Sequence, residues 1–386
     1  MPVSRPILAG VVTALVGFTS SFMVVLAGLS AVGATPAQAA SGLLAVSLTM
    51  GLGCIVLAGR YRMPITVAWS TPGAALLAAT GIVEGGWPAA VGAFLVVAAL
   101  ILLTGLWPGL GRLIARIPAS IAQAMLAGVL LPLCLAPITG IVENPWGVVP
   151  VVLTWLVFAR LAPRWAVPLA FVAATVVIAV ELARSGAAMD PMSLLPRFEL
   201  TMPAFTVGGL VGIALPLFVV TMASQNVPGV AVMRSYGYEV PWRPAMLVTG
   251  LGSALGAPAG GHAINLAAIS AALAAAPEAD PDPKRRWVAG VSTGAVYLLL
   301  GLCSAAFATL VLLAPAAVIP AVAGLALLAA FGSAVQAAVA EPAERMPAVV
   351  AFLIAASGIA PLGVSAAFWS LLAGLLVRGI LTASRR

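Results

Sequence analysis

Polar side chains interrupt the apolar segment 205–226, and their types suit the binding of a small ligand. They are Thr221, Ser224, Gln225 and Asn226. The first three stand at positions i, i+3 and i+4, so an α-helix would place them on one face. An amide inside an apolar helix is costly unless it is paired. We therefore expect Gln225 and Asn226 to contact a ligand or, alternatively, to hydrogen-bond a neighbouring helix.

Two other segments are interrupted by proline, glycine and small polar residues, as broken membrane helices are. The residues at the breaks are Ser70, Thr71, Pro72 and Gly73 in 65–81, and Gly260, Gly261, His262 and Asn265 in 258–276. Each segment is predicted to be extended first and helical afterwards, with Thr71 as N-cap and Pro72 as the first helical residue. We expect His262 at the start of its half-helix and Asn265 one turn later. Kinked packing helices are the alternative.

The chemistry expected at such breaks is anion binding. A broken helix exposes unpaired N–H groups at its new N-terminus, with about half a unit of positive charge. Two such ends near the membrane midplane would hold a small anion without Lys or Arg, and no basic residue lies centrally in any apolar segment. Gly17, Ser20 and Ser21 in segment 7–32 repeat the i, i+3, i+4 spacing. Ser20 and Ser21 are therefore further candidates for the site.

His262 is the only histidine of the chain, and three roles are open to it. A helix N-terminus disfavours an imidazolium ion, whereas a bound carboxylate favours one. This reciprocity is a thermodynamic basis for proton–anion symport. His262 could carry the proton, contact the ligand without titrating, or make a structural hydrogen bond. Sodium coupling is less favoured, because no acidic residue lies in the middle of an apolar segment.

The elements that must position these residues are membrane helices. Of 386 residues, 62% are hydrophobic and 8% are charged, whereas soluble domains carry roughly 25% charged residues. This excludes a soluble enzyme, a disordered chain and a nucleic-acid-binding module, and the continuous apolar runs disfavour an outer-membrane barrel. One histidine and three cysteines without a CxxC spacing predict no metal site, no cofactor and no catalytic centre.

The sequence contains fourteen apolar segments. They span about 7–32, 37–58, 65–81, 88–107, 118–138, 147–159, 165–183, 205–226, 244–257, 258–276, 287–312, 316–339, 346–360 and 361–381. Because each half has seven spans, an odd number, the second half must have the opposite orientation in the membrane to the first. The predicted fold is an all-α polytopic membrane protein with inverted repeats over 1–185 and 205–386, joined by the loop 186–204. Ala37-Gln38-Ala39 imitates a signal-peptide cleavage site, but the preceding apolar run is too long, so we expect a retained first helix.

The basic residues predict the orientation of these spans. With a cytoplasmic N-terminus, sixteen of the 18 Lys and Arg residues fall inside, and only Arg184 and Arg197 fall outside. Membrane proteins show this positive-inside asymmetry. We therefore expect both termini in the cytoplasm, and the net charge of +7 requires no nucleic-acid partner.

Three stretches together resemble the benzoate:proton symporter (BenE-type) family. They are 223–232 with its continuation 235–238, 68–76, and 256–265, and the resemblance extends over essentially the whole chain. This family is similar to nucleobase–ascorbate transporters and sulfate permeases. The resemblance implies a secondary transporter in a bacterial inner membrane, which imports benzoate or a similar aromatic carboxylate by proton symport. A passive anion channel, or a carrier of another anion or a nucleobase, remains the alternative, and a homodimer is left open.

The resemblance also implies two domains. Spans 1–4 and 8–11, about 7–107 and 205–312, would form the core or transport domain. Spans 5–7 and 12–14, about 118–183 and 316–381, would form the gate or scaffold domain. Substrate would lie between the half-helices of spans 3 and 10, each preceded by a short strand, and the core would move like an elevator.

The resemblance bears on single residues as well. Gln225 stands where nucleobase carriers have an acidic side chain, which would repel benzoate. The ring of benzoate would need an apolar slot, for which Phe18, Phe22 and Phe218 are candidates; plain packing is the alternative for each.

Overall fold

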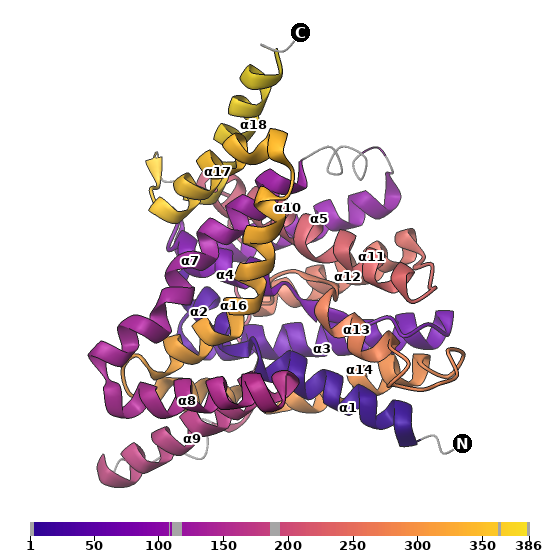
Figure 1. The fold of residues 1–386 in the computed structure, drawn as a ribbon, viewed down its shortest axis with the longest axis vertical. Coiled ribbons are helices and arrows are strands. Elements are labelled where there is room, and N and C mark those ends of the chain that lie inside the picture. Colours follow the sequence, from indigo (N-terminus) through magenta and orange to yellow (C-terminus); the bar gives the residue numbers. More distant parts are fainter. Residues whose placement is uncertain (1–3, 108, 110–117, 186–193, 362–363, 384–386) are drawn as a thin grey trace.

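The computed structural model describes residues 4–107, 109, 118–185, 194–361 and 364–383, and nearly all its elements are helices (Figure 1). Up to residue 185 the helices are α1 (Ser4–Thr19), α2 (Phe22–Ala31), α3 (Pro36–Tyr61), α4 (Thr71–Thr80), α5 (Gly86–Leu106), α7 (Ala119–Glu143), α8 (Pro145–Leu161), η1 (Pro163–Trp165) and α9 (Ala166–Ser185). Beyond the connection they are η3 (Gly208–Ala214), α10 (Leu215–Thr221), η4 (Met222–Asn226), α11 (Val227–Ser235), α12 (Trp242–Gly256), η5 (Ala257–Ala259), α13 (Ile269–Ala275), α14 (Trp287–Leu302), α15 (Ser304–Leu312), α16 (Val318–Val339), η6 (Pro342–Glu344), α17 (Arg345–Ser357) and α18 (Ala366–Ala383). Residues 186–193 of the predicted connecting loop lie outside the described residues.

Several helices can cross a membrane. Among the described residues, seven are long and apolar enough, or eight if α14 and α15, which meet at a bend of 53°, form one span. The seven are Ser4–Ala31, Pro36–Tyr61, Gly86–Leu106, Ala119–Glu143, Pro163–Arg184, Gly208–Ser235 and Val318–Val339. The chain is therefore a multi-pass membrane protein, and the fourteen crossings stay a prediction.

The first apolar segment is not one continuous helix. It breaks at Ser20 and Ser21, between α1 and α2. The next helix, α3, begins with a capping box, in which Thr35 Oγ1 accepts a hydrogen bond from the Gln38 backbone N–H and Gln38 Oε1 accepts one from that of Thr35. The Ala37-Gln38-Ala39 triplet thus forms the first turn of α3, where a capping box stabilises a helix start.

Two short strands precede two short helices, as predicted for the broken segments. Strand β1 (Val67–Trp69) leads to α4, and β2 (Ile264–Leu266) precedes α13. The strands pair antiparallel, with Ala68 opposite Asn265. The sheet thereby joins two segments about two hundred residues apart in the chain.

Side chains from neighbouring helices complete the hydrogen bonding of this small sheet. The Cys54 thiol accepts from the Val67 N–H at 3.0 Å. Ser253 Oγ accepts from the Ile264 N–H at 3.0 Å, and Asn226 Oδ1 accepts from the Leu266 N–H at 2.9 Å. Irregular backbone within a membrane protein needs such internal partners, because the bilayer core offers no water.

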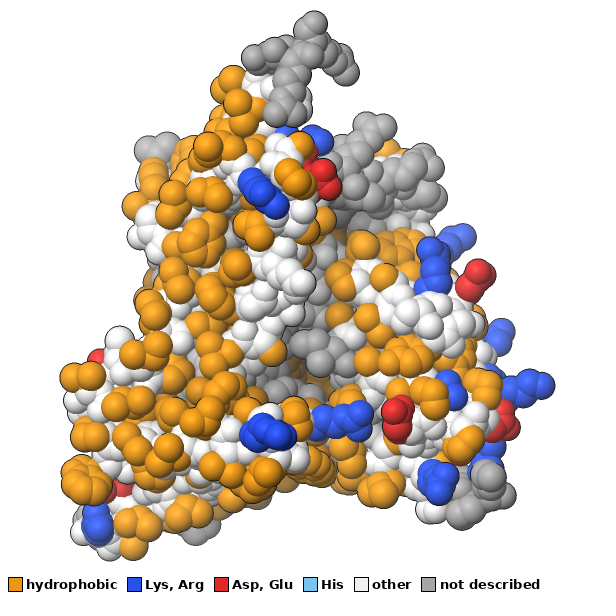
Figure 2. Space-filling view, in the orientation of Figure 1, with side chains coloured by type: hydrophobic (Ala, Val, Ile, Leu, Met, Phe, Trp, Pro, Cys, Tyr) orange, Lys and Arg blue, Asp and Glu red, His pale blue; other side chains and the backbone are white. Residues whose placement is uncertain are grey.

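The helices pack as two groups (Figure 1). One, the α3–α14 group, contains α1 to α5 and η3 to α15; the other, the α7–α16 group, contains α7, α8, α9 and α16 to α18. In Figure 2, hydrophobic side chains cover the left flank, over the α7–α16 group, while Lys and Arg gather along the right-hand edge. Such an apolar flank suits contact with lipid.

Glycines allow the closest approaches within the α3–α14 group. A Cβ at Gly51 would lie 2.8 Å from the carbonyl oxygen of Gly294, and one at Gly294 would lie 2.4 Å from that of Gly51. At Gly28 on α2, a Cβ would lie 2.3 Å from the carbonyl oxygen of Ala74 on α4. Small residues at these crossings let backbones touch, as is common between membrane helices. The contact of Gly28 with Ala74 holds α4 directly against α2.

Candidate functional site

A cavity of about 130 Å³ lies where the two helix groups meet. Its polar lining residues are Ser20, Ser21, Thr71, Gln225, Ser270 and Tyr297. Its apolar wall includes Val16, Met50, Trp69, Leu130, Leu273, Leu327 and the alanines 326, 329 and 330 of α16. Most of the lining comes from the α3–α14 group, and α7 and α16 close the opposite side.

The N-terminus of α4 reaches this cavity, although its cap differs from the prediction. Ser70 is the N-cap, and its Oγ accepts hydrogen bonds from the Gly73 N–H at 3.2 Å and from the Thr221 hydroxyl at 2.8 Å. The prediction of Thr71 as N-cap is wrong, because the serine one residue earlier already caps the helix. Ser70, Gly73 and Thr221 lie outside the cavity lining, whereas Thr71 faces the cavity.

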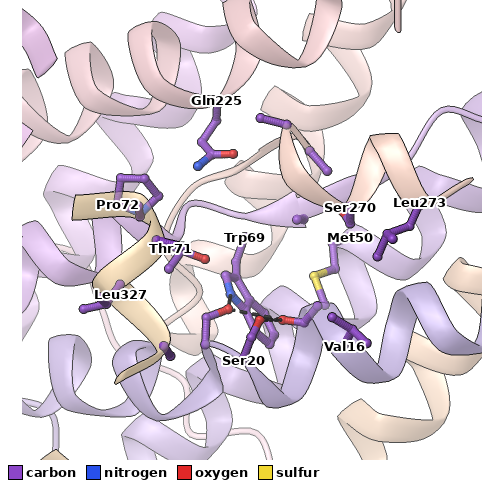
Figure 3. A pocket seen from close by; sticks show the side chains of 18 of the residues that line it. Val16, Ser20, Met50, Trp69, Thr71, Pro72, Gln225, Ser270, Leu273 and Leu327 are labelled. Atoms are coloured by element: carbon purple, nitrogen blue, oxygen red, sulfur yellow. Dashed lines mark hydrogen bonds between the residues drawn. The ribbon is translucent and has the colours of Figure 1, made fainter. Parts of the chain in front are cut away.

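Gln225 enters the cavity from a π-helical turn. The turn η4 replaces the expected α-helix over 222–226, so the i, i+3, i+4 face predicted for Thr221, Ser224 and Gln225 does not form. Of these three, Gln225 alone lines the cavity, and Figure 3 shows its amide directed toward Thr71 and Trp69. Single π-helical turns are frequent at functional sites, and here the wider turn aims one amide into the space.

The side-chain amides of Asn226 and Asn265 hydrogen-bond to the backbone of β2. Asn226 is fully buried, and besides its bond to Leu266 its Nδ2 donates to Met222 Sδ at 3.2 Å. Asn265 lies in β2, not one turn into a helix, and its Nδ2 donates to the Leu266 carbonyl. Ser224 Oγ is buried and has no hydrogen-bond partner among the described residues. All three lie outside the cavity lining.

His262 also lies away from its predicted place. The half-helix α13 begins at Ile269, so His262 precedes β2 and is not at a helix start. The reason is the turn η5, after which Gly260 adopts a positive φ of 87° and the chain runs extended. The ring is buried, with Nε2 3.2 Å from the Ser70 carbonyl oxygen. Gly260, Gly261 and His262 lie outside the cavity lining.

Trp69 provides the aromatic surface of the cavity. Its Nε1–H donates to Ser21 Oγ at 2.9 Å, and the hydroxyls of Ser20 and Ser21 donate to the Gly17 carbonyl at 3.0 and 3.3 Å. The break between α1 and α2 thus orients the indole ring. Both serines line the cavity.

Two of the three predicted ring-binding phenylalanines, Phe18 and Phe22, form an aromatic cluster with Trp69. The Phe18 ring meets the Trp69 ring at a centroid distance of 5.1 Å, and Phe22 stacks on Phe18 at 5.6 Å. Phe22 also contacts Phe171 of α9 at 5.0 Å, which links the two helix groups. Phe18, Phe22 and Phe218 are fully or almost fully buried and lie outside the cavity lining. Phe18 supports the wall by packing on Trp69, and Phe22 by packing on Phe18.

Sequence reasoning missed Trp69, Ser270 and Tyr297 as lining residues. Tyr297 stands in an apolar helix with nothing beside it to single it out, and Ser270 is one of several small residues in its segment. Tyr297 and Ser270 are far apart in the sequence, and they meet only in the folded structure, where both lie next to Gly17.

The cavity combines a few neutral polar groups with an apolar wall. Among the described lining residues none is charged, so the polar groups open to a ligand are the hydroxyls, the Gln225 amide and the N–H dipoles at the start of α4. Apolar side chains form most of the wall. Such a site is typical of small-molecule pockets, in which a few polar groups orient an otherwise apolar ligand.

Comparisons with known proteins identify the family of the chain. The family model described as benzoate membrane transport protein (BenE) matches residues 2–380. The chain is 39% identical to the inner membrane protein YdcO of Escherichia coli strain K12, over 95% of this chain and 93% of that protein. It is 30% identical to the benzoate membrane transport protein of Acinetobacter baylyi, over 97% of this chain and 94% of that protein.

Solved structures share the fold at low sequence identity. SLC26A9 superposes with a TM-score of 0.63 at 13% identity, over all of this chain and 66% of that one. The transmembrane domain of the cyanobacterial bicarbonate transporter BicA gives 0.58 at 16% identity, over 96% and 97% of the two chains. With the family model covering nearly the whole sequence, the chain belongs to the benzoate membrane transport protein (BenE) family and is a membrane transporter, not an enzyme.

Proposed function

We propose that this protein imports benzoate or a similar aromatic monocarboxylate across a bacterial inner membrane. The observation that carries the proposal is the cavity beside Trp69, whose walls are apolar and uncharged and whose polar groups include Thr71 and Gln225. Its volume of about 130 Å³ is comparable with the roughly 150 Å³ apolar cavity that binds benzene in an engineered protein. One aromatic ring therefore suits the space.

The carboxylate is placed between Thr71 and the Gln225 amide. Thr71 is the first residue of α4, where the helix dipole favours an anion, and the amide N–H groups of Gln225 can donate to a carboxylate oxygen. The ring then lies along Trp69 toward Met50 and Leu273, which are on the far side of Trp69 from Thr71 in Figure 3.

Transport requires that the cavity open to each side in turn. In the proposed mechanism the α3–α14 group is the core, and it moves like an elevator against the α7–α16 group, which is the gate. The placement of the cavity between these groups supports this division, as do the strand-and-half-helix units in both halves of the chain. Fourteen crossings in two inverted repeats, with both termini cytoplasmic, complete the proposal.

Uptake is proposed to be coupled to protons, with His262 as the proton carrier. If Nε2 donates to the Ser70 carbonyl, Nδ1 keeps a free lone pair, and Nδ1 is buried without a hydrogen-bond partner among the described residues. A proton there would put positive charge beside the α4 N-terminus. The free-energy cost of protonating His262 falls when a carboxylate occupies the adjacent cavity. The proton and the carboxylate therefore each strengthen binding of the other.

Replacing His262 with Gln tests this coupling. The Gln amide can still donate to the Ser70 carbonyl but cannot take up a proton, so we expect benzoate exchange to persist while gradient-driven accumulation falls about tenfold or more. Both fluxes are measured in the same proteoliposomes, with exchange as the control. Unchanged proton-driven accumulation would remove His262 as the carrier.

The function itself is tested by uptake of labelled benzoate into proteoliposomes. We expect saturable, concentrative uptake under an inward proton gradient that a protonophore abolishes, after correction for benzoic acid leak into empty liposomes. Flux that neither saturates nor concentrates would indicate a passive channel. No protein-dependent flux would contradict a benzoate carrier and direct the assay to other anions and nucleobases.

A further inference from the structure

Gly17, Ser270 and Tyr297 form a compact polar cluster at one end of the cavity. Tyr297 and Ser270 both lie against the position of Gly17. A Cβ at Gly17 would lie 2.6 Å from Tyr297 Oη and 4.0 Å from Ser270 Cβ. All three line the cavity, and both hydroxyl-bearing side chains are more than nine-tenths buried.

This cluster is remote from the groups assigned to the carboxylate. In Figure 3, Ser270 lies with Met50 and Leu273 on one side of Trp69, while Thr71 and Pro72 lie on the other. An aromatic acid lying along Trp69 with its carboxylate at Thr71 therefore presents the far edge of its ring to Ser270 and Tyr297. An unsubstituted ring would leave this polar end without a ligand partner.

We propose that the Ser270–Tyr297 pair recognises a hydroxyl group on the ring, so that meta- and para-hydroxybenzoates are substrates of this site. Two hydroxyls together have two donors and four acceptor lone pairs. Acceptor capacity is left for a ring O–H. The inference rests on the proposed function, since it takes its carboxylate position from there.

The same geometry discriminates among substituted rings. A methyl group at the para position has the bulk of a hydroxyl but leaves the polar pair unmatched. A second carboxylate at that end would meet two hydroxyls and no cation, because the described lining residues are uncharged, and burying an unpaired charge is costly. The hydroxyl of salicylate lies beside the carboxylate and cannot reach Tyr297, which makes salicylate a control ligand of equal composition.

The experiment measures binding to the purified full-length protein by calorimetry, with benzoate, 3- and 4-hydroxybenzoate, 4-methylbenzoate and salicylate. Tyr297→Phe keeps the aromatic ring and removes the hydroxyl that lies next to Gly17. We expect it to weaken one or both of 3- and 4-hydroxybenzoate about threefold to tenfold, the value of one neutral hydrogen bond. Benzoate and salicylate should change less than twofold. Ser270→Ala should give the same pattern, and Tyr236→Phe, outside the cavity, should change nothing.

The outcomes separate this inference from the function on which it rests. An equal loss for all ligands, or no selective loss in either variant, overturns the hydroxyl recognition while leaving benzoate binding established. Binding of hydroxybenzoate without benzoate supports the inference and contradicts benzoate as substrate. Binding of none contradicts both.

Discussion

Replacing Gln225 with Glu is expected to abolish benzoate binding at neutral pH while leaving the fold intact. The side chain lines the cavity and is directed toward Thr71, so the new carboxylate would face the bound one. Two like charges about 4 Å apart repel by roughly 4 kcal/mol at an effective dielectric constant of 20. We therefore expect affinity to fall at least about 100-fold.

The pH dependence of this variant distinguishes repulsion from a loss of packing. Protonation makes the introduced carboxyl neutral, close in shape to the original amide. Binding should therefore return as the pH is lowered from about 8 toward 5, while benzoate itself is still an anion. The wild-type protein binds already at pH 8, so the rise in its affinity from protonation of His262 should be much smaller than the recovery of the variant.

Two further variants control the Gln225 experiment. Gln336→Glu adds the same charge at an exposed position of α16 and should leave affinity unchanged. Gln225→Met removes the hydrogen bonds without adding charge and should weaken binding less than Glu does, with no recovery at low pH. Full-strength binding by Gln225→Glu at neutral pH would show that the carboxylate lies elsewhere.

Replacing Gly28 with Ala is expected to disable the site from a distance. The new methyl group would lie 2.3 Å from the Ala74 carbonyl oxygen, which is backbone and cannot rotate away. Helices α2 and α4 must separate, so Thr71 and Ser70 move with α4. Overpacking of this kind costs about 1–3 kcal/mol. We expect a lower unfolding temperature together with loss of benzoate binding.

Gly332→Ala is the matched control for this prediction. Gly332 lies inside α16, and a Cβ there would meet no atom within 4 Å. Alanine favours a helix over glycine by up to about 1 kcal/mol, so this variant should be as stable as wild type or slightly more so, with unchanged binding. The unfolding temperature and the benzoate affinity of both variants are measured by thermal unfolding and calorimetry. If the two alanine variants behave alike, contact between α2 and α4 does not position the site.

Proline and glycine signalled the breaks in segments 65–81 and 258–276, whereas the break at Ser20 and Ser21 within segment 7–32 was not predicted. The strand-and-helix units of α4 and α13 follow from the prolines and glycines, and Gln225 stands out because an amide is costly in an apolar segment. The error at Thr71 arose because two adjacent residues can both cap a helix. The face predicted for Thr221 and Ser224 assumed α-helical spacing, and no residue type announces a π-helical turn.

Other parts of the site have no local signal at all. Alanines of α16 line the cavity through the packing of one helix group on the other, and this packing depends on the whole chain. Tyr297 becomes part of the site because Gly17 leaves room for its hydroxyl. Such pairs are separated by hundreds of residues, so periodicity cannot find them.

The pairing of β1 with β2 bears on how the chain is made. Val67 pairs with Leu266, and the ribosome adds the intervening residues, about 200, in roughly 10–40 s. During that time β1 is without the partner strand that it pairs with in the folded protein. Neither half can complete its own half-helix unit alone. The two-stranded sheet can therefore form only after the second half of the chain has been synthesised.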